Sequence, residues 1–347
     1  MAQQLYDRTA EDLGNLVGLE HVNLRINNQG LASEFYLSAL GLTRDPYMFP
    51  GTNNMWVNVG KSQFHLPTGD PNVLRGHVGL VVPSLEELCE RLSEAKKKLA
   101  DTKFDCKQHN QYVEATCPWG NKFRLYEPDE ERFGAINLGM PYVEFTVPEG
   151  TADGIARFYR EIFYTPACVK ENGEGRAAHV CAGARQELIF RETDRKIPEF
   201  DGHHLQVYAQ EFSGPHDELE KRGLITEESD QYQYRFQDIA CLDTGKCLFT
   251  IEHEVRSVTH PLYNRHMVNR NPSQNNRHYQ MGADEWDWTL PRSTKKIQPA
   301  PAPDRGSVRR SRVRWLRRER GLSTSTALPP DARQERSTAR RRALPAT

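Results

Sequence analysis

The chain has 347 residues, of which 37% are hydrophobic and 27% charged, which is ordinary for a globular protein with one large core or two domains. It contains no run near the roughly 20 consecutive apolar residues of a membrane-spanning helix, and it starts without the basic and then apolar pattern of a secretory signal. We therefore expect a cytoplasmic protein. Seven scattered cysteines without a CxxC pair argue against a disulfide framework and a thiolate zinc site.

Short apolar runs bounded by turn residues predict the same order of elements twice in the first 130 residues. Strands are expected near 18–26, 43–48, 54–59 and 62–67, and again near 75–83, 103–108, 112–117 and 122–127. Amphipathic helices over 31–42 and 85–99 follow the first strand of each set. The predicted fold class is therefore α+β, built from tandem βαβββ units.

The next 120 residues repeat this plan with altered residues. We expect a strand at 139–147, a helix at 151–163, a strand at 186–190, and then a further unit from 202–208 to 248–252. Residues 128–134 form a polar linker. The predicted organisation is an N-terminal segment (1–17), a first module (18–134), a second module (135–256), an extension packing on the modules (257–292) and a tail (293–347).

The tail differs from the rest of the chain in composition. Residues 293–347 carry fifteen Lys or Arg against four Asp or Glu, with many Pro and Ser and few apolar residues. Such a segment cannot bury enough surface to offset chain entropy, so it is predicted to be disordered. Its charge would suit nucleic acid or an anionic membrane surface, although a solvated extension without a partner is the interpretation we favour.

Potential metal ligands occupy equivalent places of the first two units. His21 and His77 each lie on an opening strand, and Glu127 ends the second closing strand. Imidazole and carboxylate together suit a divalent first-row metal, and two His with one carboxylate is the open-faced iron(II) arrangement. We therefore predict a metal site of His21, His77 and Glu127. His65 ends the first closing strand and could be a fourth ligand, a general acid or base, or an ordinary cleft residue.

The arrangement resembles the vicinal oxygen chelate superfamily, which includes glyoxalase I, extradiol dioxygenases and bleomycin resistance proteins. The resemblance covers roughly residues 15–255 and is carried by the segments GLEHVNL, FHLP, RGHVGLVVPSLEEL, CPWGNKFRLYEPDE, GHHLQVY and FTIEHE. It implies paired βαβββ units that curl around a cleft, with metal ligands on the first and last strands. A divalent ion (Fe²⁺, Mn²⁺, Ni²⁺ or Zn²⁺) would then bind two adjacent oxygens of a small-molecule substrate.

The later units show an incomplete set of the same residues. Tyr142 stands opposite His21 and Leu188 opposite His65, and only the last unit keeps His203 or His204 with Glu252. The dioxygenase pattern implies a tyrosine about ten residues before the carboxylate ligand, a position that Cys117 holds in this chain. His109 and Tyr112 are the nearest replacements, so with His65 they complete the predicted catalytic residues.

The sequence therefore predicts a metal-dependent enzyme, either a lyase or isomerase of the glyoxalase kind or an extradiol-type dioxygenase. The alternative is a metal-free protein of the bleomycin-resistance kind that binds a small molecule and performs no chemistry. No glycine-rich phosphate loop and no nucleophile elbow occur in the sequence. Nucleotide-dependent enzymes and triad hydrolases thus have no support.

Overall fold

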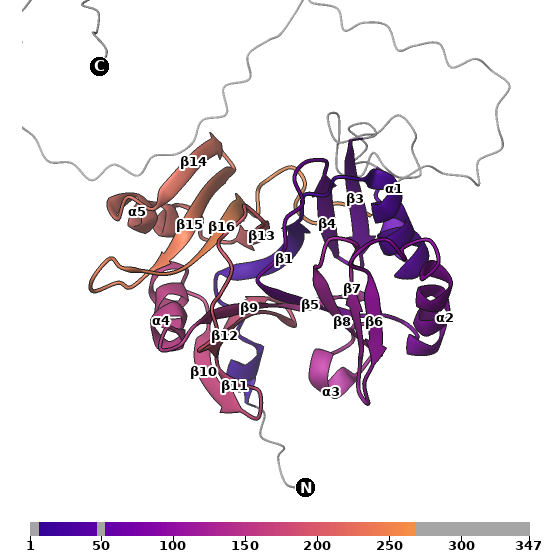
Figure 1. The fold of residues 1–347 in the computed structure, drawn as a ribbon. Coiled ribbons are helices and arrows are strands. Elements are labelled where there is room, and N and C mark those ends of the chain that lie inside the picture. The colour runs from indigo at the N-terminus through magenta and orange to yellow at the C-terminus, as the bar shows by residue number, and fades with distance from the viewer. Residues whose placement is uncertain (1–6, 47–52, 268–347) are drawn as a thin grey trace, which may run out of the picture. The chain divides into compact units, whose positions relative to one another are not determined.

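The computed structural model describes residues 7–46 and 53–267, which form four consecutive βαβββ units (Figure 1). The first contains β1 (Leu16–Asn23), α1 (Gln29–Ala32) with the adjoining π-helical η2 (Ser33–Ala39), β2 (Thr43–Arg44), β3 (Asn54–Val59) and β4 (Ser62–Pro67). The second contains β5 (Gly76–Val81), α2 (Leu85–Ala95), β6 (Asp105–Gln108), β7 (Val113–Thr116) and β8 (Lys122–Tyr126). The short helices η1 (Arg8–Glu11) and α3 (Glu130–Phe133) precede the first unit and follow the second.

The third and fourth units follow the same order. They contain β9 (Gly139–Pro148), α4 (Ala152–Ile162), β10 (Ala167–Asn172), β11 (Gly175–Gly183) and β12 (Gln186–Thr193), then β13 (His204–Ala209), α5 (Ser213–Lys221), β14 (Ile225–Asp230), β15 (Gln233–Ala240) and β16 (Cys247–Ser257). The predicted α+β class and tandem βαβββ order are confirmed. The tail (293–347) and residues 268–292 of the predicted extension lie outside the described residues.

The units combine into two eight-stranded sheets, and the order of the units in these sheets is not predicted from the sequence. One sheet runs β14-β15-β16-β13-β1-β4-β3-β2 and joins the fourth unit to the first. The other runs β10-β11-β12-β9-β5-β8-β7-β6 and joins the third unit to the second. Each expected module (18–134 and 135–256) therefore contributes one unit to each sheet.

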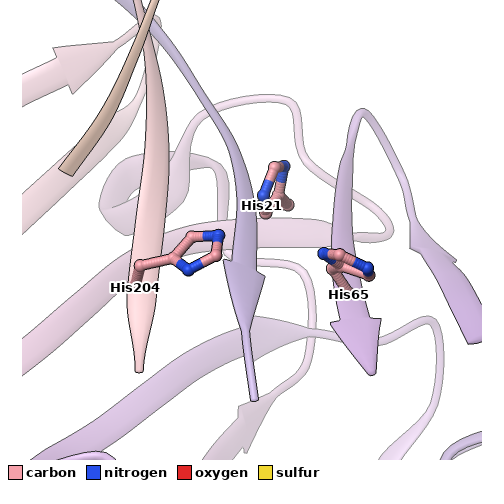
Figure 2. A group of neighbouring side chains, drawn as sticks. All are labelled: His21, His65 and His204. Carbon is pink, nitrogen blue, oxygen red and sulfur yellow. The ribbon is translucent and has the colours of Figure 1, made fainter. Parts of the chain in front are cut away.

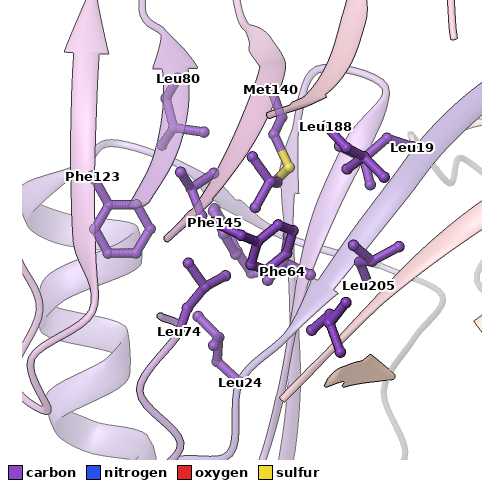
Figure 3. Close-up of a cluster of buried hydrophobic side chains, with 14 of the residues drawn as sticks. Leu19, Leu24, Phe64, Leu74, Leu80, Phe123, Met140, Phe145, Leu188 and Leu205 are labelled. Carbon is purple, nitrogen blue, oxygen red and sulfur yellow. The ribbon is translucent and has the colours of Figure 1, made fainter. Parts of the chain in front are cut away.

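A shared hydrophobic core explains why the two sheets stay together. Figure 3 shows side chains from both sheets in one cluster, among them Leu19 and Phe64 from the first sheet and Phe123 and Phe145 from the second. All four are essentially inaccessible to solvent. Burial of this apolar surface is the main favourable term in folding, so the chain is held by one core across both sheets rather than by one core for each half.

Strand register decides which residues of different units face one another. At the centre of the first sheet β1 runs antiparallel to β13, which places Asn23 opposite His204. On either side, β1 pairs in parallel with β4, and β13 pairs in parallel with β16. The opening and closing strands of the first and fourth units are therefore neighbours. No helix within the described ranges is long and apolar enough to cross a bilayer.

Candidate metal centre

The three residues predicted to form one metal site do not lie together. His21 is on β1 of the first sheet, whereas His77 is on β5 of the second. Glu127 is exposed one residue beyond the end of β8, and its Oε1 accepts a hydrogen bond from the backbone N–H of Leu85 at the start of α2 (3.3 Å). His21 and His77 lie apart because of how the units pair. The first unit shares a sheet with the fourth, whereas the second unit shares a sheet with the third.

Three histidines converge on the first sheet instead. One side-chain nitrogen of each of His21, His65 and His204 lies within 4.8 Å of those of the other two. Figure 2 shows the rings, which come from the adjacent strands β1, β4 and β13. The His21 ring centroid is 5.9 Å from that of His65 and 5.7 Å from that of His204. The cluster thus contains His21 and His65, which the sequence predicts as site residues, and His204, which the sequence shows only as part of an incomplete set in the last unit.

His21 and His65 share one hydrogen-bonding pattern, and His204 differs from them. The Nδ1 of His21 lies 3.2 Å from Glu20 Oε2, and that of His65 lies 2.6 Å from the Asn23 side-chain amide. His204 has a more distant carboxylate oxygen near each nitrogen, with Glu252 Oε1 3.5 Å from Nδ1 and Glu254 Oε2 3.6 Å from Nε2. Each Nε2 is buried and has no hydrogen-bond partner among the described residues. Buried polar atoms are normally hydrogen-bonded, so three such nitrogens on histidines of adjacent strands would suit a ligand that accepts lone pairs.

His253 shows how a structural histidine differs in the same sheet. Its Nε2 is 2.6 Å from the Tyr159 hydroxyl and its Nδ1 is 2.8 Å from the Ile251 carbonyl oxygen. The ring also stacks on Phe236 with a centroid distance of 4.2 Å. Both nitrogens of His253 are satisfied by protein groups, in contrast with the three clustered histidines.

Burial keeps the imidazoles of His65 and His204 in the form that binds metals. Desolvation, with the nearby charges of Arg256 and Arg235, lowers the pKa of His65 to about 2, and burial holds the pKa of His204 well below its usual range. Burial alone would raise the pKa of Glu20, but the hydrogen bond to His21 and the charge of Arg256 bring it down to about 2. At neutral pH His65 and His204 are uncharged, as metal ligation by imidazole requires. Glu20 is ionised and can accept a hydrogen bond from His21.

Charged and aromatic side chains surround the three rings. The Trp56 indole stacks on His65, with a centroid distance of 3.9 Å and an interplanar angle of 14°. The guanidinium of Arg235 binds both Glu252 and Glu254, and Arg256 binds Glu254 at 2.6 Å. Glu252 and Glu254 are therefore already bound by guanidinium groups, which leaves the imidazole nitrogens as the available metal ligands.

A cavity of about 1140 Å³ adjoins this part of the sheet. Glu20, Tyr208 and Gln186 line it together with the segment 262–267. That segment is anchored across the sheet, because the Arg265 guanidinium lies 2.7 Å from the buried carboxylate of Asp45. A small molecule in the cavity would contact Glu20, the hydrogen-bond partner of His21.

The corresponding place in the second sheet has different chemistry. His77 Nε2 lies 3.2 Å from the Tyr142 hydroxyl, which lies 2.8 Å from the Tyr126 hydroxyl. Arg191 binds Glu144 through two contacts of 3.0 Å. Both tyrosines belong to a small buried apolar cluster with Val81, Phe133, Ala177 and Ile189. Among the described residues of this sheet, no three metal-binding side chains converge.

The two other predicted catalytic residues also belong to the second sheet. His109 stacks on Tyr112 at the turn between β6 and β7, with a centroid distance of 4.5 Å and an interplanar angle of 16°. The Arg124 guanidinium lies 5.2 Å from the Tyr112 ring centroid. The structure therefore does not place His109 and Tyr112 beside His65, which lies on the first sheet.

Searches with the sequence give no relative: no family model matches the chain, and no curated protein matches it. Comparison of the structures does. A glyoxalase I variant from Zea mays superposes with a TM-score of 0.51 at 12% identity, covering 72% of this chain and 95% of that one. Glyoxalase I from Zea mays gives a TM-score of 0.50 at 12% identity, covering 69% and 92%.

The chain has the vicinal oxygen chelate fold. A putative dioxygenase from Bacillus subtilis is also similar, with a TM-score of 0.48 and 15% identity over 70% of this chain and 86% of that one. The two glyoxalase I structures confirm the resemblance predicted from the sequence for the fold. At these identities the comparison shows the fold alone, and the activity of the chain has to be argued from its own residues.

Proposed function

We propose that the chain is a metal-dependent enzyme in which His21, His65 and His204 hold one divalent cation. The observation that supports this most is the arrangement of the rings, since one nitrogen of each lies within 4.8 Å of those of the other two and each Nε2 is buried without a hydrogen-bond partner among the described residues. Three histidines with an open fourth position form a known type of catalytic zinc site. His65 then acts as a ligand, one of the roles that its position in the sequence left open.

The donor set favours Lewis-acid chemistry of the lyase or isomerase kind over reaction with dioxygen. A cation held there would polarise two neighbouring oxygens of a small substrate. Three neutral imidazoles leave the ion its full charge, whereas the iron(II) arrangement of dioxygenases includes a carboxylate. In this chain the nearby Glu252 and Glu254 are both bound by Arg235.

The surrounding residues would position the substrate and limit the access of water. Trp56 covers one face of His65, and Glu20 keeps a fixed negative charge beside His21. The neighbouring cavity of about 1140 Å³, which Glu20 lines and the three histidines do not, is large enough for a small molecule. A metal-free binding protein would use the same cavity, which makes it the second candidate function.

Metal analysis of the purified full chain separates the two candidates. The proposal predicts about one equivalent of Zn²⁺, Ni²⁺, Mn²⁺ or Fe²⁺ for each chain after loading and dialysis, with the metal lost in His21→Ala. His77→Ala is the matched control, because His77 is also a buried strand histidine but lies in the other sheet. Equal metal content in wild type and His21→Ala would contradict the proposal.

A substrate panel then tests for an enzyme. We expect turnover of a thiol adduct of a 2-oxoaldehyde rather than of a catechol, because the donor set favours isomerisation. His65→Gln should weaken metal retention, as expected of a ligand. If His65→Gln retains the metal and loses only turnover by about 10² to 10⁴, His65 is instead the general acid or base. A chain that binds panel compounds without metal and converts none of them would be a binding protein.

A further inference from the structure

The strand that carries His21 contains an irregularity beside the metal centre. Leu19 pairs with Val207 and His21 with Gln206, so the register between β1 and β13 shifts at Glu20, which has no partner of its own. In a regular strand successive side chains point to opposite faces, and a bulge breaks that alternation. Leu19 and Val22 enter the core, whereas Glu20 and His21 contact each other through their side chains.

The Glu20 carboxylate is fixed from several directions. The Tyr208 hydroxyl donates to Oε1 at 3.0 Å, and the Arg256 guanidinium donates to Oε2 at 3.1 Å. Arg256 is held in turn by Gln233 Oε1 at 2.8 Å. Glu20 is only 7% exposed. The carboxylate therefore cannot swing toward solvent and meets His21 Nδ1 in one orientation.

We propose that Glu20 is a positioning residue that fixes the ring and the tautomer of His21 so that Nε2 presents its lone pair to the metal. This inference rests on the proposed function and deepens it. A carboxylate accepts but does not donate, so the 3.2 Å contact requires the proton on Nδ1. Carboxylates in this role orient ligand histidines and raise their basicity. The bulge is the backbone feature that brings two consecutive side chains into one site.

The second sheet supplies a matched control. His179 Nδ1 lies 3.0 Å from Glu187 Oε2, a pair with the same chemistry on β11 and β12. Neither residue belongs to the histidine cluster. Replacement of Glu187 should therefore change a carboxylate–histidine contact without changing the metal site.

The test measures Zn²⁺ affinity by competition with a chromophoric chelator. Glu20→Gln should weaken binding about 10- to 100-fold, the usual effect of removing such a partner, whereas Glu187→Gln should bind as wild type does. Tyr208→Phe leaves the carboxylate in place and should weaken binding less than Glu20→Gln. If Glu20→Gln binds within twofold of wild type, the inference is overturned.

A measurement on the unaltered protein keeps the inference falsifiable if Glu20→Gln does not fold. Nitrogen-15 NMR of the metal-free wild type should show His21 with its proton on Nδ1. A proton on Nε2 would overturn the positioning role. Absence of Zn²⁺ binding by wild type would instead refute the proposed function, and the tautomer of His21 would still report on Glu20 by itself.

Discussion

Replacement of His204 by alanine tests whether the first and fourth units build one metal site. Zinc sites with four protein ligands bind with roughly 10–16 kcal/mol, so one ligand accounts for about 3 kcal/mol. A loss of that size weakens binding about 100-fold. His204 is 8% exposed, and its carboxylate neighbours are Glu252 and Glu254. In the variant both carboxylates would still be bound by the Arg235 guanidinium. The metal-free fold should therefore lose no more than about 0.5–3 kcal/mol, the range of ordinary substitutions.

The assay combines chelator competition with urea unfolding of the metal-free protein. His77→Ala serves as the control, because its ring contacts Tyr142 and Glu144 in the other sheet. We expect wild-type Zn²⁺ affinity for His77→Ala and about 100-fold weaker affinity for His204→Ala. Equal Zn²⁺ affinities of the two variants would refute a site that His204 shares with His21. Weaker Zn²⁺ binding by His77→Ala alone would support the site of His21, His77 and Glu127 predicted from the sequence.

Two further predictions concern stability. Burial lowers the pKa of His253 to about 3 from the ordinary value of 6.5. Between these two pH values His253 is protonated in the unfolded chain and neutral in the folded chain. The free energy of unfolding should fall from pH 6.5 toward 3, and His253 should contribute up to about 1.4 kcal/mol per pH unit to this fall, beside the other buried histidines. His253→Gln should reduce the slope by about that amount in urea titrations; an unchanged slope would exclude His253 as a source. Gly60→Ala should lower the thermal midpoint more than Gly150→Ala, because both have positive φ but only at Gly60 would a Cβ lie 2.1 Å from the Leu138 carbonyl oxygen; equal losses would contradict this reason.

The sequence predicts the strands well where alternation and turns are both clear. The strands expected at 54–59 and 62–67 match β3 and β4 residue for residue. Side-chain alternation fixes such strands locally, since each buries one face on the core. The pairing of the units cannot be predicted in this way, because any of the four similar units could supply the strand that pairs with the opening strand of another unit. That choice depends on packing in the shared core, which no local pattern encodes.

The candidate site shows the same division between local and long-range information. The places of His21 and His65 on an opening and a closing strand predict a role for both, and this local argument finds two members of the cluster. The third member follows from sheet order, which makes β13 the neighbour of β1. In the second sheet, register places Lys122 rather than Glu127 beside His77. The distance of a residue from the end of a strand is thus a weaker guide than its register.

The most direct test of the central claim is an X-ray structure of the full chain with Zn²⁺, with anomalous scattering at the zinc edge to locate the ion. The account predicts one ion about 2.0–2.1 Å from an imidazole nitrogen of each of His21, His65 and His204. An ion beside His77, or three histidines that remain unligated at saturating Zn²⁺, would contradict it.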